Sequence, residues 1–218
     1  MKDRPELHHL NLPGAPERLQ AVVAIGENAS RRGLSAYELE GLCDHMLPGR
    51  AVMRETSGRP VVRGSSLHIS LSHADGLTAL ALAPFLVGID VEWIDPEFDV
   101  FEFDLELFGE QDFHLLETCE GGSRRDHFYR LWTLKEANLK LRGRNLLSDP
   151  LHNISGAPNT CTAWITRPTG RYCVGVSWQA AASDLSPHPA SNTLVDRPVP
   201  RQPMATCPRP RDHFEICS

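Results

Sequence analysis

The chain has 218 residues, enough to bury the apolar core of one large or two small domains without disulfide bonds. Its formal net charge of -6 counts against non-specific nucleic-acid binding, and its six cysteines are scattered without the spacing of a zinc site, which favours a reducing compartment. The N-terminus lacks the apolar segment of a secretory signal, and the most apolar stretch, Leu77–Val91, is too short to span a bilayer. We therefore expect a cytoplasmic monomer that binds neither nucleic acid nor membrane.

Charge is segregated along the chain. Residues 64–123 contain many acids and no lysine or arginine, and a series of basic residues follows from Arg124 to Arg144. Two solvated faces of opposite sign would explain this pattern. A cation-holding acidic site beside a basic surface for an acidic partner would explain it as well.

The first half of the chain predicts helices followed by strands. Ser35 and Glu38 form a capping box, and apolar residues at helical spacing follow until Pro48 and Gly49 end the pattern. A less regular helix is expected over residues 17–31. Alternating and short apolar runs then predict strands at residues 51–56, 67–71, 77–83 and 85–93.

The second half predicts the same order. A helix near residues 109–118 precedes a break at Gly121 and Gly122, and Ser123 opens a longer helix that Gly143 ends. Strands are expected at residues 162–166 and 171–178. Beyond about residue 182 the chain is rich in proline and poor in large apolar residues, so we expect a disordered tail.

The segment Gly88–Glu92 is the first candidate for chemistry. On a strand, Ile89 and Val91 face the core while Asp90 and Glu92 emerge together on the other side. Neighbouring carboxylates repel unless a positive group lies between them, and Mg²⁺ prefers such oxygen ligands. An amphipathic strand with its acids toward water would give the same pattern.

The segment Trp132–Gly143 is the second candidate. At 3.6 residues per turn, Trp132, Glu136 and Lys140 share one face of the predicted helix. A surface ion pair would explain Glu136 and Lys140. It would not explain Trp132 on the same face, because a tryptophan is rarely left beside solvent unless it packs or supports a site.

The third candidate, Ser70–His73, ends a predicted strand. A serine and a histidine there can bind phosphate through their side chains and nearby backbone N–H groups. Ser72 and His73 are unsuited to act as nucleophile and base because adjacent strand residues point in opposite directions. Upstream, Arg59 offers a cation from a turn, although an ordinary surface arginine would look the same.

In combination, S-L-S-H at 70–73, G-I-D-V-E at 88–92 and W-T-L-K-E-A-x-L-K-x-x-G at 132–143 resemble the signature of surfactin-type 4′-phosphopantetheinyl transferases. The resemblance spans residues 17–178 and is densest from 59 to 143. It implies an α+β fold of two similar halves related by a pseudo-two-fold axis, residues 1–83 and 84–181, with coenzyme A in the cleft between them. Residues 182–218 form the proline-rich tail.

The resemblance also implies a role for each motif residue. Three carboxylates would bind Mg²⁺, with Mn²⁺ as an alternative, and these are Asp90, Glu92 and Glu136. The residues near coenzyme A would be Lys140 at the diphosphate, Ser72 and His73 at the 3′-phosphate, and Arg59 as a further cation. Glu110 would match an acid near the metal.

The implied reaction moves the 4′-phosphopantetheine arm of coenzyme A to a serine of an acyl or peptidyl carrier protein and releases 3′,5′-ADP. Glu136 or Glu110 could orient or deprotonate that serine. Carrier proteins of fatty acid, polyketide and nonribosomal peptide synthesis all fit. Because the carrier is typically acidic, the candidates for docking it are Arg124, Arg125, Arg142 and Arg144.

Two other functions were weighed. A non-catalytic relative that binds the carrier protein or coenzyme A would be marked by loss of a metal carboxylate, whereas Asp90, Glu92 and Glu136 are all present. A metal-dependent nuclease or other phosphodiesterase also uses acids and a lysine. In the common nuclease core, however, the lysine follows an acid by two residues on a strand, and Lys140 follows Glu136 by four on a predicted helix.

Overall fold

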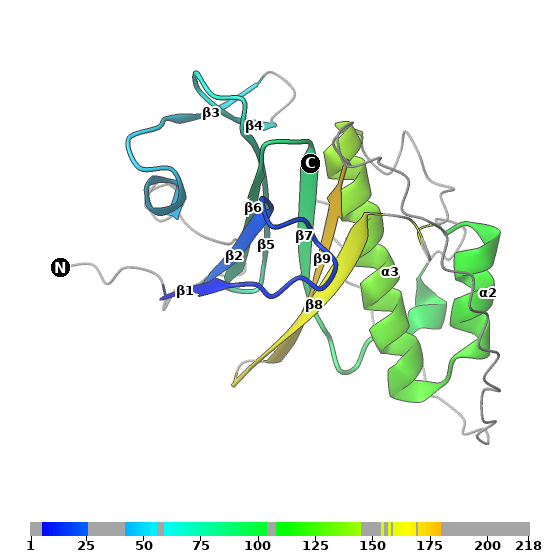
Figure 1. Cartoon of the computed structure of the whole chain (residues 1–218). Coiled ribbons are helices and arrows are strands. Elements are labelled where there is room, and N and C mark those ends of the chain that lie inside the picture. Colours follow the sequence, from blue (N-terminus) through cyan, green and yellow to red (C-terminus); the bar gives the residue numbers. More distant parts are fainter. Residues whose placement is uncertain are drawn as a thin grey trace.

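The computed structural model describes residues 6–25, 42–55, 59–103, 108–144, 154, 157, 159–168 and 170–179. Within these residues the strands form two antiparallel sheets (Figure 1). The six-stranded sheet has the order β1-β2-β6-β5-β4-β3, and the three-stranded sheet has the order β7-β9-β8. The strands are β1 Glu6–His9, β2 Gln20–Ile25, β3 Val52–Arg54, β4 Pro60–Val62, β5 His68–Ala74, β6 Leu77–Ala83, β7 Val87–Trp93, β8 Thr160–Arg167 and β9 Gly170–Trp178.

The two sheets face each other, and helices cover their outer sides (Figure 1). The long helix α3, Gly121–Arg142, packs on β7 and β9, while α2, Glu110–Thr118, and the short 3-10 helix η1, Val100–Glu102, pack against α3. Residues 42–46 are also helical. Their buried Leu42 packs against the six-stranded sheet in a cluster with residues of β2, β5 and β6. The described residues contain no helix long and apolar enough to cross a membrane.

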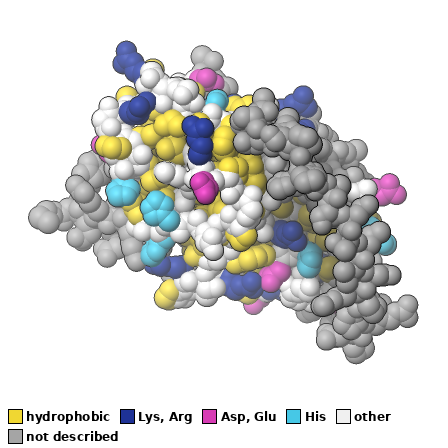
Figure 2. Space-filling view, in the orientation of Figure 1, with side chains coloured by type: hydrophobic (Ala, Val, Ile, Leu, Met, Phe, Trp, Pro, Cys, Tyr) yellow, Lys and Arg dark blue, Asp and Glu magenta, His cyan; other side chains and the backbone are white. Residues whose placement is uncertain are grey.

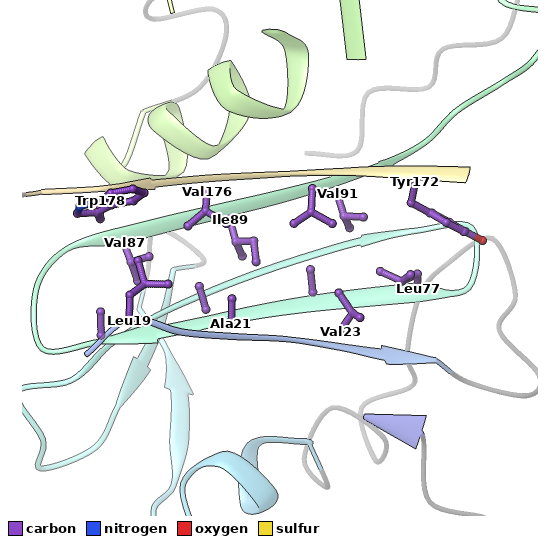
Figure 3. Close-up of a cluster of buried hydrophobic side chains, with 14 residues drawn as sticks. Leu19, Ala21, Val23, Leu77, Val87, Ile89, Val91, Tyr172, Val176 and Trp178 are labelled. Carbon is purple, nitrogen blue, oxygen red and sulfur yellow. The ribbon is translucent and has the colours of Figure 1, made fainter. Parts of the chain in front are cut away.

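The main core lies between the two sheets (Figure 3). Ala21 and Val23 from β2 meet Ile89 and Val91 from β7, and Val176 from β9 completes this part of the cluster. Burial of such apolar surface contributes about 25 cal/mol for each Å² removed from water. Because side chains alternate along a strand, the odd-numbered residues of β7 fill this core and the even-numbered ones face α3.

Two glycines allow α3 to lie very close to the three-stranded sheet. A Cβ atom added at Gly88 would overlap the backbone oxygen of Ala137, and one at Gly175 would lie 2.5 Å from the backbone carbon of Thr133. Glycine within a strand often marks such an approach by another backbone. The pair Gly88 and Gly175 therefore sets the height of α3 above β7 and β9.

An aromatic cluster supports the other side of α3. Phe128 and Trp132 stack with ring centroids 6.2 Å apart, and Phe103 meets both rings edge-on. Nearby, the fully buried Asp112 of α2 accepts a hydrogen bond of 2.6 Å from the backbone N–H of Ile154. The ring contacts of Phe128 and Trp132 help to fix the rotation of α3 about its own axis, and with it the direction of the helix face that meets β7.

The mixed α+β class predicted from the sequence is confirmed, with antiparallel sheets. The predicted end of the long helix is also found, since Gly143 adopts the left-handed conformation with φ 64. The pseudo-two-fold relation and the boundaries at 83 and 181 stay predictions. The capping box at 35–38 and the tail at 182–218 lie outside the described residues.

The helix expected over residues 17–31 is wrong where the structure describes it. Residues 20–25 form β2, a strand paired on both sides, with β1 and β6. Its buried run, which includes Val22 and Val23, has apolar residues on both faces, so the sequence lacks the alternation that identifies a half-buried strand. The predicted break at Gly121 and Gly122 is also wrong, because α3 begins at Gly121.

Candidate functional site

Polar side chains from β7 and α3 meet on the side of β7 that faces away from the main core. The Nε1–H of Trp132 donates a hydrogen bond of 3.2 Å to Oε1 of Glu92. One and two helical turns further on come Glu136 and Lys140, and the Nζ of Lys140 lies 2.7 Å from Oδ1 of Asp90 in an ion pair. The shared helix face and the shared strand face predicted from the sequence therefore meet each other.

Ser72 joins this group from the six-stranded sheet. Its Oγ donates a hydrogen bond of 2.7 Å to Oδ1 of Asp90 and accepts one of 2.9 Å from the Nζ of Lys140. On the same strand, the Oγ of Ser70 accepts a hydrogen bond from the backbone N–H of Ile89 and so aligns β5 with β7. Oδ1 of Asp90 is consequently the point where β5, β7 and α3 are linked.

Asp90 is buried, Glu92 and Glu136 are partly buried, and these carboxylates feel one another's charge. Burial, and then the negative charge of Asp90, raise the pKa of Glu92 to about 8, although the hydrogen bond from Trp132 and the charge of Lys140 act in the opposite direction. Burial, and then Asp90, raise the pKa of Glu136 to about 7, against the charges of Lys140 and Lys135. Without a further positive charge, Glu92 is therefore protonated for much of the time at neutral pH.

The fit of a divalent cation was tested on these residues. No group of three or more His, Cys, Asp or Glu side chains in the described part of the chain is already arranged as a metal site. Asp90 is only 4% exposed, however, and its second oxygen, Oδ2, is buried without a hydrogen-bond partner. A buried carboxylate oxygen without a partner, next to two carboxylates of raised pKa, is a hard-oxygen donor set that Mg²⁺ suits and would stabilise.

The other predicted site residues lie on other elements. His73 is exposed at the end of β5, and Glu110 is exposed at the start of α2. Arg59 directly precedes β4. Burial, and then the positive charge of Arg59, lower the pKa of the His68 imidazole. Asp90 accepts hydrogen bonds from Ser72 and Lys140, and the roles of His73, Glu110 and Arg59 stay predictions.

One docking candidate has a structural task. The Nε–H of Arg124 donates a hydrogen bond of 2.9 Å to the carbonyl of Leu116 near the end of α2, and its guanidinium lies 4.2 Å from the ring centroid of the exposed Phe101. Arg142 and Arg144 are exposed at the end of α3. Arg142 and Arg144 therefore stay predicted docking residues for an acidic partner.

Sequence reasoning missed two features of this site. It did not foresee the hydrogen bonds of the Ser72 hydroxyl with Asp90 and Lys140, and the predicted contact of Ser72 with a nucleotide phosphate stays a prediction. It also overlooked Gly175, although a glycine within a predicted strand is a recognised sign of close backbone approach. No local pattern could have paired Ser72 with Lys140, because 68 positions separate them in the chain.

Comparison with known proteins agrees with the geometry. Residues 86–183 match the family described as the 4′-phosphopantetheinyl transferase superfamily. This part of the chain is thus similar to members of that superfamily. The resemblance predicted from the three motifs is therefore confirmed.

Several transferases of known name are similar to the chain. The 4′-phosphopantetheinyl transferase psf-1 of Bacillus pumilus is 32% identical over 109 residues, which cover 47% of this chain and 44% of the relative. The transferase gsp of Aneurinibacillus migulanus is 32% identical over 41% of this chain and 36% of the relative. HetI of Nostoc is 31% identical over 41% of this chain and 40% of the relative. The chain thus spans less than half the length of each of these transferases.

The superfamily segment contains only part of the site. Asp90, Glu92, Glu136 and Lys140 lie inside residues 86–183, whereas Ser72 lies outside them. The hydrogen bonds of Ser72 nevertheless join it to Asp90 and Lys140. The structure therefore extends the transferase-like centre to a strand that the family match does not reach.

Proposed function

We propose that the protein transfers the 4′-phosphopantetheine arm of coenzyme A to a serine hydroxyl of an acyl or peptidyl carrier protein and releases 3′,5′-ADP. The observation that supports this most directly is the buried, partnerless Oδ2 of Asp90, which lies in a centre that also holds Glu92, Glu136 and Lys140. The match of residues 86–183 to the transferase superfamily supports the reaction class.

The three carboxylates would hold Mg²⁺ or Mn²⁺, which when bound supplies positive charge to the diphosphate of coenzyme A. Asp90 offers Oδ2 for this purpose, and Glu92 is oriented by the hydrogen bond from Trp132. Glu136 joins them from the adjacent turn of α3. The fit rests on the burial of these oxygens and on their mutual repulsion.

The chain's own side chains would stabilise the negative charge on the leaving group and accept the proton of the attacking serine. The serine oxygen of the carrier forms a bond to the phosphorus that carries the pantetheine arm, and the bond from that phosphorus to the bridging oxygen breaks, so 3′,5′-ADP leaves with the electron pair. Lys140 would stabilise the negative charge on the leaving diphosphate oxygen. The serine proton would pass to a carboxylate, and Glu136, which lies one helical turn before Lys140 on α3, is one candidate for this task. Glu110 is the alternative base.

The nucleotide end of coenzyme A would bind at the six-stranded sheet. His73 is exposed at the end of β5, next to a turn in which Asp75 has φ 32 and Gly76 has φ 87. On the strength of the family resemblance, we assign His73 to the 3′-phosphate and Arg59 as a further cation for coenzyme A. The facing sheets, each covered by a helix on its outer side, are compatible with the proposed pair of similar halves (Figure 1).

An acidic carrier protein is the proposed partner, docking near Arg142 and Arg144. On the face shown in Figure 2, basic and acidic side chains of the described residues are interspersed between apolar ones. The charge segregation along the sequence thus does not form two opposite patches on that face. We therefore place the docking surface at the end of α3, close to Lys140.

The test is incubation with coenzyme A, Mg²⁺ and an apo carrier protein, followed by intact-mass measurement of the carrier. We expect a mass gain of one phosphopantetheine arm, which Glu136→Ala abolishes. Glu117→Ala, which removes an exposed carboxylate of α2, serves as the matched control and should leave transfer unchanged. Binding of coenzyme A without any mass gain would favour a non-catalytic relative, and release of nucleotides from DNA would favour a phosphodiesterase.

A further inference from the structure

Lys140 lies where the proposed centre needs a positive charge. Its ammonium is 2.7 Å from Oδ1 of Asp90 and donates to the Oγ of Ser72, which in turn donates to the same carboxylate oxygen. The side chain of Asp90 is almost fully buried, while that of Lys140 is 33% exposed. The ammonium can therefore swing toward solvent, and the carboxylate cannot.

A cation bound at Asp90 would change the balance around Lys140. An ammonium and a divalent cation that share one buried carboxylate repel each other, because little water screens them there. The diphosphate of the proposed substrate offers the ammonium a second anionic partner. Lys140 sits on the last turns of α3 with a long side chain that reaches outward from the helix.

We propose that Lys140 occupies the cation's place beside Asp90 while no metal is bound, and that metal binding moves its ammonium from Asp90 to the diphosphate of coenzyme A. Ser72 acts as a positioning residue that keeps its hydrogen bond to Oδ1 of Asp90 through this exchange. The inference rests on the proposed function. It assigns to Lys140 a competition with the metal, and to Ser72 a role at the carboxylate in place of the nucleotide phosphate.

The exchange has a consequence for binding order. In the absence of coenzyme A, a divalent cation must displace the ammonium without providing it with a new partner, so metal alone binds weakly. When the diphosphate is present, the displaced ammonium gains a partner and metal binding becomes tighter. Metal and coenzyme A therefore bind cooperatively, and the cooperativity depends on Lys140.

The first experiment compares Mn²⁺ binding, measured by electron paramagnetic resonance without nucleotide, in the wild type, Lys140→Gln and Arg130→Gln. Arg130 is exposed on the same helix and provides the matched loss of a positive charge. We expect Lys140→Gln to bind Mn²⁺ roughly tenfold more tightly, as for one neighbouring charge. Arg130→Gln should change the affinity by about twofold or less, because solvent screens its charge. Equal affinity of Lys140→Gln and the wild type would overturn the proposal.

The second experiment follows Lys140 in the wild-type protein and so does not depend on how a variant folds. The chain has only three lysines, Lys2, Lys135 and Lys140, and Lys135 is 1% exposed. Acetylation of each lysine can be read by peptide mass spectrometry. Mg²⁺ alone should raise the acetylation rate of Lys140 severalfold and leave that of Lys2 unchanged, and adding 3′,5′-ADP with pyrophosphate should lower it again. An unchanged Lys140 rate at saturating Mg²⁺ contradicts the exchange.

The third experiment tests Ser72. Ser72→Ala should weaken Mn²⁺ binding by roughly tenfold, as expected when a carboxylate loses a hydrogen bond, and Ser72→Thr should restore it because threonine keeps the hydroxyl. A loss of affinity in both variants would indicate a packing role and remove Ser72 from the proposal.

The exchange and the proposed function can fail separately. If the wild type transfers the arm to the carrier but Lys140→Gln binds Mn²⁺ with wild-type affinity, only the exchange is overturned. Tighter Mn²⁺ binding in Lys140→Gln without any transfer by the wild type would overturn the proposed function alone.

Discussion

The two faces of β7 behave in opposite ways. The face with Ile89 and Val91 is fully buried between the sheets and consists of apolar groups that stabilise the fold. The face with Asp90 and Glu92 meets α3 and brings carboxylates close together, with a raised pKa at Glu92. One face of β7 thus stabilises the folded state, whereas burial of the carboxylates on the other face disfavours their charged form. The apolar contact between the sheets therefore holds the charged face of β7 in place against α3.

Truncation on the apolar face should have the largest effect. Ile89→Ala removes buried methyl groups from between the sheets, and we expect it to lower the free energy of unfolding by about 4 kcal/mol. Urea unfolding followed by circular dichroism measures this. Met53→Ala, which shortens a side chain that is 50% exposed, is the control and should cost less than about 1 kcal/mol. If the two costs were similar, the face of β7 with Ile89 would not be the structural one.

The second largest effect should come from the close contact between α3 and β7 at Gly88. Gly88→Ala places a methyl group against the backbone oxygen of Ala137, so α3 must move away from β7, and we expect a loss of about 3 kcal/mol together with the loss of transfer. Gly122→Ala is the matched control, because an added Cβ there meets nothing within 4 Å. It should leave stability unchanged or raise it slightly. A Gly88→Ala protein of wild-type stability would show that α3 is not held by this contact.

The charged face predicts a pH dependence in protein kept metal-free with a chelator. The folded-state pKa of Glu92 is about 8 and that of Glu136 about 7, both above their ordinary value of 4.5. Between pH 4.5 and these raised pKa values, the folded state binds more protons than the unfolded state. The free energy of unfolding therefore falls as pH rises through this range. We expect a loss on the order of 2 kcal/mol from pH 6 to pH 9, measured by urea unfolding. Glu92→Gln should flatten this dependence, and a stability that rises over the same range would contradict the raised pKa values.

The smallest effect should come from the contact between the two elements of the charged face. Trp132→Phe keeps an aromatic ring in the stack with Phe128 but removes the N–H that donates to Glu92. Because that hydrogen bond lowers the pKa of Glu92, its loss should move the pH midpoint of stability upward. At pH 8 the free energy of unfolding of the variant should differ from that of the wild type by about 1 kcal/mol. A midpoint that moves downward would mean that the hydrogen bond does not act on the carboxylate.

Several parts of the fold follow from local sequence. The long helix, its end at Gly143 and the alternation of β7 were predicted because each depends on residues a few positions apart. β2 was taken for a helix because a strand with apolar residues on both faces carries no alternation. The short strands β1 and β4 went unpredicted, since four and three residues give too little pattern to recognise.

The sequence by itself determined which side chains share a face: Asp90 with Glu92 on a strand, and Trp132 with Glu136 and Lys140 on a helix. Local backbone geometry repeats every two or 3.6 residues, so such sets can be read without a structure. Only the tertiary structure decided that Ser72 meets Asp90 across 18 positions and that Lys140 meets Asp90 across 50. The physical reason is that packing sets these distances, through the facing sheets and through glycines that let α3 approach β7.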